Sequence, residues 1–215
     1  MVRQQLKKVP GLALLHYKLT QQRDMHVWKT HGRPMPPPHK IKTDTVIEYG
    51  QKFAALNLVE TGTFLGHMVD ATKKYYSKII SIELGEDLAT DARKRFSKYG
   101  YIDILQGDSS RLLPDILRNL SGKTIFWLDA HHSSSVTAIG ESYTPILSEI
   151  TVIAGWDQSL TVLLIDDARL FTGKDYPEMS TFKEFIKMHF PMHEIDITND
   201  IIRVTPRDMG LISGR

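Results

Sequence analysis

The sequence predicts an α/β fold: a doubly wound, mostly parallel sheet of seven strands, with helices on both faces and a C-terminal antiparallel hairpin. Short, nearly uninterrupted apolar segments alternate with helical segments from residue 57 onward, which is typical of a parallel sheet covered on both faces. A glycine-bearing turn follows the first of these strands, where such sheets bind ligands. Two strand-like segments joined by Asn199-Asp200 end the pattern, and a tight turn of this kind indicates a hairpin.

The expected elements follow from apolar spacing and from turn residues between them. The strands are Leu58–Glu60, Lys78–Glu83, Tyr101–Gln106, Thr124–Asp129, Thr161–Asp166, Met192–Thr198 and Ile201–Thr205. The helices between them are His67–Tyr76, Asp87–Tyr99, Ser110–Leu120, Thr144–Ala154 and Ser180–Phe190. We therefore expect one α/β domain over residues 43–215.

The first 42 residues differ in charge from the rest of the chain. They carry nine Lys or Arg against the single acid Asp24, a net charge of +8, whereas the remainder is −6. An amphipathic helix is expected over Leu6–Leu19, interrupted at Pro10-Gly11, then a polar segment and an extended Pro-rich connector, Arg33–His39. Residues 1–42 are thus a basic N-terminal extension, and Asp44 is expected to cap a helix that runs to Leu56.

A basic extension on an acidic body has two interpretations. It can attract an anionic partner such as a phosphate, a nucleic acid, a membrane surface or an acidic substrate, or it can dock on its own acidic domain. Zero cysteines exclude disulfides, thiolate metal sites and cysteine nucleophiles. No apolar run approaches the ~20 residues of a membrane span. We expect a soluble, cytoplasmic protein without a membrane partner, and a homo-oligomer is compatible with the sequence.

The glycine turn is the strongest candidate for a cofactor site. It reads Glu60-Thr61-Gly62-Thr63-Phe64-Leu65-Gly66 and leads directly into a helix. Glycine lets the backbone turn sharply and approach a ligand, and amides at a helix start can point at polar ligand groups. Phe64 stands where a dinucleotide fingerprint has its middle glycine, which disfavours NAD and FAD. Candidate cofactor-binding residues are Glu60, Thr61, Gly62, Thr63 and Gly66.

Acids also follow the other strands, at the sheet edge where ligands bind. Glu83 ends the second strand about 20 residues past the turn, where an acid can accept hydrogen bonds from ribose hydroxyls, and Leu84 is next to it. Asp129 follows the fourth strand, and Asp166 and Asp167 follow the fifth. Converging carboxylates repel one another unless a cation neutralises them, and hard oxygen ligands suit Mg²⁺. These three aspartates are the candidate metal ligands.

The glycine turn resembles motif I of the class I, Rossmann-like, S-adenosylmethionine-dependent methyltransferases. It is most similar to the metal-dependent O-methyltransferases of the macrocin/novobiocin sugar type and the catechol/caffeoyl-CoA type. The resemblance covers Thr43 to about Arg207 and includes the order of the acids and the terminal hairpin. It implies that Asp108 and Ser109, after the third strand, lie near the adenine; as an alternative, either residue caps the following helix.

The resemblance also assigns the catalytic centre. Asp129, Asp166 and Asp167 match the family's metal ligands, and Asp129 is expected to contact the cofactor and to act in catalysis. The family places its general base two or three residues past the first metal aspartate, which here gives His131 and His132. Familiar branches have Lys or Asp there, so the base assignment departs from the pattern. As an alternative, one histidine ligates Mn²⁺, Fe²⁺ or Zn²⁺.

The implied function is divalent-metal-assisted O-methylation of a small hydroxylated acceptor, a sugar or secondary metabolite, with S-adenosylmethionine as the methyl donor. Two alternatives remain open at this point. The first is a nucleic-acid methyltransferase that uses the basic extension as a binding arm; against it, the sequence has no Asn-Pro-Pro-Tyr-type motif after the fourth strand. The second is a binding module that keeps the cofactor pocket without turnover.

Overall fold

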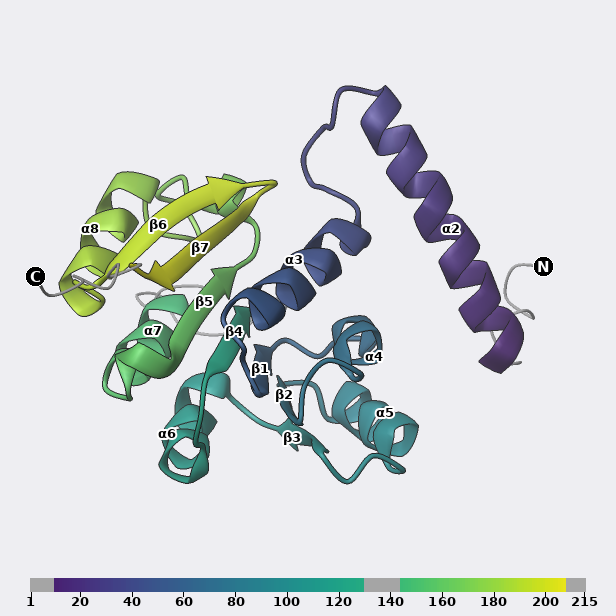
Figure 1. The fold of residues 1–215 in the computed structure, drawn as a ribbon, viewed down its shortest axis with the longest axis horizontal. Helices are drawn as coiled ribbons and strands as arrows, with labels where there is room; N and C mark the ends of the chain where they lie inside the picture. The colour runs from purple at the N-terminus through teal and green to yellow at the C-terminus, as the bar shows by residue number, and fades with distance from the viewer. Residues whose placement is uncertain (1–9, 130–143, 208–215) are drawn as a thin grey trace, which may run out of the picture.

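The computed structural model describes residues 10–129 and 144–207, and Figure 1 shows their arrangement. Its centre is a seven-stranded sheet in the order β3-β2-β1-β4-β5-β7-β6. The pairs β1·β2, β1·β4, β2·β3 and β4·β5 are parallel, whereas β7 runs antiparallel to both β5 and β6. The predicted fold class is therefore confirmed, including the antiparallel hairpin at the end of the chain.

The elements lie close to their predicted positions. The strands are β1 Asn57–Thr61, β2 Lys78–Glu83, β3 Ile102–Gln106, β4 Thr124–Leu128, β5 Thr161–Ile165, β6 His193–Thr198 and β7 Ile201–Pro206. The helices are α2 Pro10–Thr30, α3 His39–Lys52, α4 His67–Thr72, α5 Glu86–Phe96, α6 Ser109–Asn119, α7 Ile146–Ala154 and α8 Met179–His189. Two short 3₁₀ turns, η2 Gln158–Leu160 and η3 Ala168–Leu170, flank β5.

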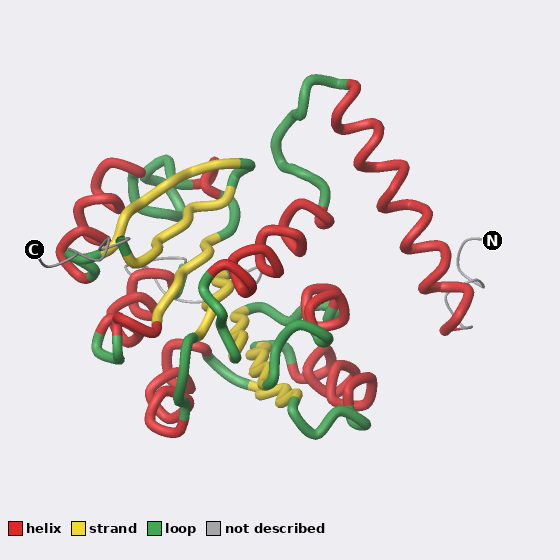
Figure 2. Tube along the Cα trace, viewed as in Figure 1, coloured by secondary structure: helices red, strands yellow, loops and turns green. Residues whose placement is uncertain are grey.

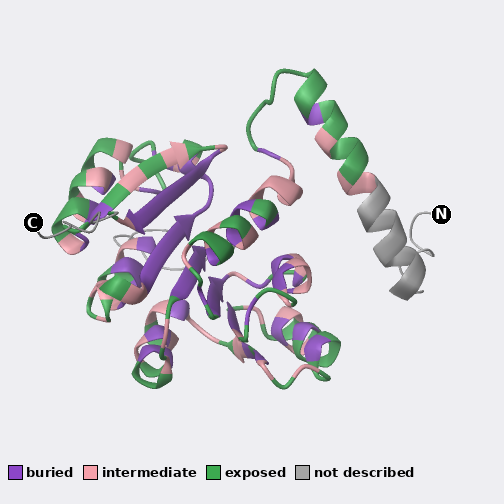
Figure 3. Ribbon diagram, in the orientation of Figure 1, coloured by how far each residue is buried: buried purple, intermediate pink, exposed green. Residues whose placement is uncertain are grey.

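Helices cover both faces of the sheet and make a three-layer structure (Figures 1 and 2). On one face, α6, α7 and α8 pack Leu113, Ile150 and Phe182 against the strands. On the other, α3, α4 and α5 contribute Val46, Val69 and Phe96 to a second core. Successive strand residues alternate between the two cores, and β1, β4 and β5 are buried along their whole length (Figure 3). Burial on both faces explains the continuous apolar strands in the sequence.

The N-terminal segment differs from prediction in its helix bounds. The predicted helix Leu6–Leu19 ends too early, because α2, which the structure describes from Pro10, continues through the predicted polar segment to Thr30. Residues 6–9 lie outside the described residues. Figure 1 shows α2 standing apart from the sheet and its covering helices, joined to them by the Pro-rich connector.

Helix α3 also begins earlier than predicted. It starts at His39, directly after Pro38, so Asp44 is not its cap; Asp44 lies within the helix and pairs with Lys40 at 2.7 Å. Each proline of the connector disfavours a helical conformation in the residue before it. The helix therefore starts only after Pro38, the last of these prolines. The predicted boundary between residues 42 and 43 thus falls inside α3, which packs Val46 into the core.

The hairpin and its turn agree with the sequence pattern. Asn199 and Asp200 both have positive φ, 52° and 64°, as the tight turn between two twisted strands requires. Within the described ranges, none of the helices combines the length and apolar character needed to cross a membrane.

Candidate active site

Three aspartates form an acidic centre at the carboxyl ends of β4 and β5. Asp129, Asp166 and Asp167 each offer a carboxylate oxygen, and these oxygens all lie within 4.8 Å of one another. The parallel strands hold them there, because Asp129 N–H donates to Thr61 O and Asp166 N–H donates to Leu128 O, both at 3.1 Å. The structure therefore brings together the three residues that the sequence singled out as metal ligands.

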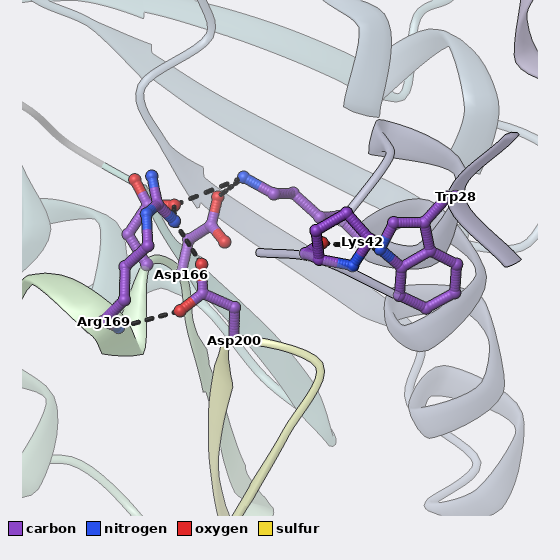
Figure 4. Close-up of polar contacts among 7 residues, drawn as sticks. Trp28, Lys42, Asp166, Arg169 and Asp200 are labelled. Carbon is purple, nitrogen blue, oxygen red and sulfur yellow. Dashed lines mark hydrogen bonds and ion pairs between the residues drawn. The ribbon is translucent and has the colours of Figure 1, made fainter. Parts of the chain in front are cut away.

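A lysine from the N-terminal part of the chain enters this centre. Lys42, on α3, directs its ammonium at Asp166 Oδ2 in a short ion pair and lies 3.6 Å from Asp167 Oδ1 (Figure 4). The Lys42 side chain is 15% exposed and that of Asp166 is fully buried. Burial opposes the charge on Lys42, but Asp166 and its neighbouring carboxylates outweigh this effect and raise the Lys42 pKa. Lys42 is therefore a protonated counter-ion and not a base.

The acidic centre retains an excess of negative charge beside Lys42. Burial, and after it the negative charge of Asp129, raise the pKa of Asp166 to about 7, although Lys42 acts in the opposite direction. Asp166 Oδ1 is buried without a hydrogen-bond partner among the described residues. An orphaned carboxylate oxygen beside two further carboxylates is a donor set that fits a hard divalent cation such as Mg²⁺. The residues present therefore fit the metal that the family pattern implies.

Asp167 is fixed by an arginine that also binds the terminal hairpin. Arg169 Nη1 lies 2.5 Å from Asp167 Oδ1 and forms a short ion pair with Asp200, and Arg169 N–H donates to Asp200 Oδ1 at 2.7 Å (Figure 4). The hairpin turn thus supports the end of β5. Since Arg169 is engaged on both sides, its role is to hold Asp167 in place.

The glycine turn after β1 has the backbone geometry that the sequence predicts. Gly62 and Gly66 have φ of 92° and 68°, a region that residues with a Cβ adopt reluctantly. Beneath the turn, Thr63 Oγ1 and Ser81 Oγ are 2.6 Å apart, and Ser81 donates a short hydrogen bond to the buried Glu60. Burial raises the pKa of Glu60 to about 8. The side chains of Glu60 and Thr63 therefore tie β1 to β2.

The acid at the end of β2 also holds the turn. Glu83 accepts hydrogen bonds from Phe64 N–H at 2.7 Å and from Gly85 N–H at 2.9 Å. These bonds fix its carboxylate between the glycine turn and the start of α5, with further lone pairs able to accept from a ligand. Leu84, beside it, is 49% exposed.

The residues after β3 act at the start of α6. Asp108 is the N-cap, and its carboxylate accepts from Ser110 N–H at 2.9 Å, as the alternative interpretation predicts. Ser109 is buried, and its hydroxyl donates to Glu149 Oε1 on α7 at 2.5 Å. Neither contact conflicts with a nearby adenine, but both show that these side chains organise the start of the helix.

Solved structures that match this chain share its fold and little of its sequence. An O-methyltransferase TomG from Streptomyces achromogenes, solved with S-adenosylmethionine, is 15% identical, with a TM-score of 0.57 over 86% of this chain and 87% of its own. A methyltransferase PaMTH1 of Podospora anserina, bound to S-adenosylhomocysteine, is 15% identical, with a TM-score of 0.55 over 78% of each chain. A caffeoyl-CoA O-methyltransferase candidate from Staphylococcus aureus is 11% identical, with a TM-score of 0.54 over 90% and 97%.

This chain has the class I methyltransferase fold. The similarity that the glycine turn and the order of acids predict is thus confirmed at the level of the fold. No protein-family model matches the sequence, and no curated protein matches it either.

The sequence did not predict two contacts near the candidate site, that of Lys42 with the acidic centre and that of Glu149 with Ser109. In the sequence, Lys42 is one of the nine basic residues before position 43. Nothing in its position along the chain indicates that it pairs with Asp166, the residue after β5. Glu149 is 1% exposed, and burial raises its pKa to about 7 although Ser109 donates to it. A glutamate among the apolar residues of α7 was the one available signal, because an unpaired acid is costly to bury.

The predicted bases, His131 and His132, lie outside the described residues. Within them, His39 at the start of α3 lies near Asp129, with its ring centroid 5.9 Å from that of His67. Burial, then the nearby His67, lower the pKa of His39 to about 4, although Asp129 acts in the opposite direction. His39 is therefore neutral near pH 7 and adds no positive charge to the acidic centre.

Proposed function

We propose that this protein transfers a methyl group from S-adenosylmethionine to a hydroxyl oxygen of a small acceptor, with a divalent cation bound at the acidic centre. The observation that carries the proposal is the placement of two sites at one edge of a methyltransferase-type sheet. The glycine turn and Glu83 follow β1 and β2, and the acidic centre follows the adjacent β4 and β5. A cofactor on the first site would present its reactive end to an acceptor on the second.

The cofactor half of the site has preorganised groups. Glu83 is already held by two backbone N–H groups, which supports its role as an acceptor for ribose hydroxyls. Gly62 leaves room for close backbone approach, and Gly66 begins α4 with a left-handed conformation. Asp108 and Ser109, at the start of α6, are proposed to lie near the adenine. Phe64 and Leu84 are large exposed apolar side chains beside these groups and would cover a flat ring or ribose.

The acidic half would hold the cation and the acceptor. Asp129, Asp166 and Asp167 are the proposed ligands, supported by their mutual proximity and by the unpartnered Asp166 oxygen. A bound divalent ion lowers the pKa of a coordinated hydroxyl and fixes its orientation. Arg169 and Asp200 hold the Asp167 side chain, as outer-shell groups do at metal sites.

The reaction requires one proton acceptor. The methyl group would move from the cofactor sulfur to the acceptor oxygen, S-adenosylhomocysteine would leave, and the hydroxyl proton would pass to a base. His131 or His132 remains the proposed base, because histidine titrates near neutral pH and both follow Asp129 closely. Lys42 is not the proposed base, since its carboxylate partners keep it protonated, and an exposed lysine away from them is also protonated near pH 7.

The contacts of the extension favour a small acceptor over a nucleic acid. Lys42 and Lys40, two of the nine basic residues before position 43, pair with acids of the chain itself. The Lys42 pair supports docking of the end of the extension on its own domain, whereas the Lys40–Asp44 pair lies within α3 and α2 stands apart from the sheet. A nucleic-acid methyltransferase would instead bind RNA or DNA with a steep salt dependence.

Calorimetric titration with S-adenosylhomocysteine, with and without Mg²⁺, tests the cofactor assignment. We expect micromolar binding, followed by Mg²⁺-dependent turnover in a screen of sugars and vicinal diols. Absence of binding under both conditions would contradict the proposal, and binding without turnover on any acceptor would favour a non-catalytic module.

A further inference from the structure

The Lys42 ammonium contacts the same carboxylates that would bind a divalent cation. Its ammonium bridges Asp166 Oδ2 and Asp167 Oδ1, two of the three carboxylates of the acidic centre. The bridge joins α3, before the first strand, to the end of β5, and the two paired residues are 124 positions apart in the chain. Lys42 therefore neutralises carboxylate charge that a bound metal ion would otherwise neutralise.

A divalent cation and this ammonium repel each other at such close range. Magnesium binds carboxylate oxygen at about 2.1 Å, so an ion on these carboxylates would lie within a few ångströms of the Lys42 nitrogen. Both would be largely shielded from solvent, where water screens their repulsion poorly. A lysine can leave, because its charge sits on a flexible four-carbon stem and the side chain is 15% exposed.

We propose that Lys42 and a divalent cation are mutually exclusive counter-ions of the acidic centre, so that Lys42 sets the affinity of this centre for the cation. The unpartnered Asp166 Oδ1 provides a first contact for an incoming ion while Lys42 still holds Oδ2. Completion of the coordination then displaces the ammonium toward solvent. The inference rests on the metal site of the proposed function, but it concerns binding and needs neither cofactor nor acceptor.

The first test measures cation affinity in three variants by calorimetric titration with Mg²⁺ and Mn²⁺, without cofactor. Lys42→Met should bind at least tenfold more tightly than the wild type, because its competitor is gone. Lys42→Arg should bind no better than the wild type, because the charge remains. Lys40→Met is the matched control: Lys40 is on the same helix and pairs with the exposed Asp44, so its loss should leave the affinity unchanged.

The second test uses the wild-type chain and so does not depend on a variant that folds. Brief acetylation followed by mass spectrometry reports how exposed each lysine amine is. Saturating Mg²⁺ should raise the labelling rate of Lys42 severalfold while that of Lys40 stays constant.

Equal or weaker cation binding by Lys42→Met, or Lys42 labelling that Mg²⁺ leaves unchanged, would overturn the proposal. Failure of the proposed function would look different: S-adenosylhomocysteine would not bind, whatever the cation titrations give.

Discussion

Lys42 and Asp166 form a buried ion pair between the helix that precedes the sheet and the end of its fifth strand. The pair fixes the start of α3 over the acidic centre, immediately after a connector that Trp28 anchors by donating its indole N–H to Pro34 O at 2.7 Å (Figure 4). The end of the basic extension is therefore tied to the candidate active site, although α2 itself stands apart from the sheet.

Loss of the Asp129 carboxylate should affect Mg²⁺ binding and thermal stability differently. Asp129→Ala should weaken Mg²⁺ binding at least tenfold, because one of three ligands is lost. It should leave thermal stability unchanged or raised, since the Asp129 charge is one of the causes that raise the pKa of Asp166. Turnover should be lost.

Asp115→Ala is the control for this variant, because Asp115 is an exposed acid on α6 that pairs with Arg118. It should change none of the three quantities: Mg²⁺ affinity, thermal stability and turnover. An Asp129→Ala protein that binds Mg²⁺ like the wild type would remove Asp129 from the ligand set.

The cofactor site predicts a selective loss of affinity at the end of β2. Glu83→Gln should weaken binding of S-adenosylhomocysteine by about 10- to 100-fold, since hydrogen bonds to a charged group contribute about 1.5–3 kcal/mol. Glu86→Gln removes an exposed glutamate three residues later and should bind normally. Calorimetry on both variants checks this, and similar affinities would mean that Glu83 only supports the turn.

The glycine turn predicts a strain effect. Gly66→Ala places a Cβ 2.8 Å from the Phe96 ring at a residue with φ of 68°. We expect a loss of about 1–3 kcal/mol of unfolding free energy. Gly100→Ala has no atom within 4 Å of the added Cβ and should be close to neutral. Urea unfolding compares the two variants, and equal stabilities would show that the turn relaxes without cost.

Buried Glu60 predicts a dependence of stability on pH in the metal-free protein. Its pKa rises from an ordinary 4.5 to about 8 on folding. Between these values the folded chain keeps a proton that the unfolded chain has released, so this group makes stability fall as pH rises. The slope is at most about 1.4 kcal/mol per pH unit for one proton.

Glu60→Gln should flatten this slope, and the exposed Glu48→Gln should not. Urea unfolding between pH 5 and 8 in the presence of EDTA measures both. The assignment fails if Glu60→Gln and the wild type lose stability in parallel over this range.

The alternation of apolar strands with helices was sufficient to predict the sheet. Both faces of β1, β4 and β5 are buried, and strands buried on both faces have mostly apolar sequences. The convergence of Asp129, Asp166 and Asp167 followed from the same pattern, since parallel strands end at one edge. Gly62 and Gly66 were predictable because few other residues tolerate their backbone conformation.

Contacts between distant elements needed the tertiary structure. Lys42 looks like any other basic residue of the extension until α3 is packed on the sheet. The apolar neighbours of Glu149 indicate that it is buried, but they do not identify Ser109 as its partner. Apolar periodicity reports which face of an element is buried, but not which polar group lies opposite it. The residue pattern along the chain was thus enough to predict the fold and the three carboxylates at the sheet edge. The packing of α3 is needed to show that a lysine of the same chain neutralises two of these carboxylates.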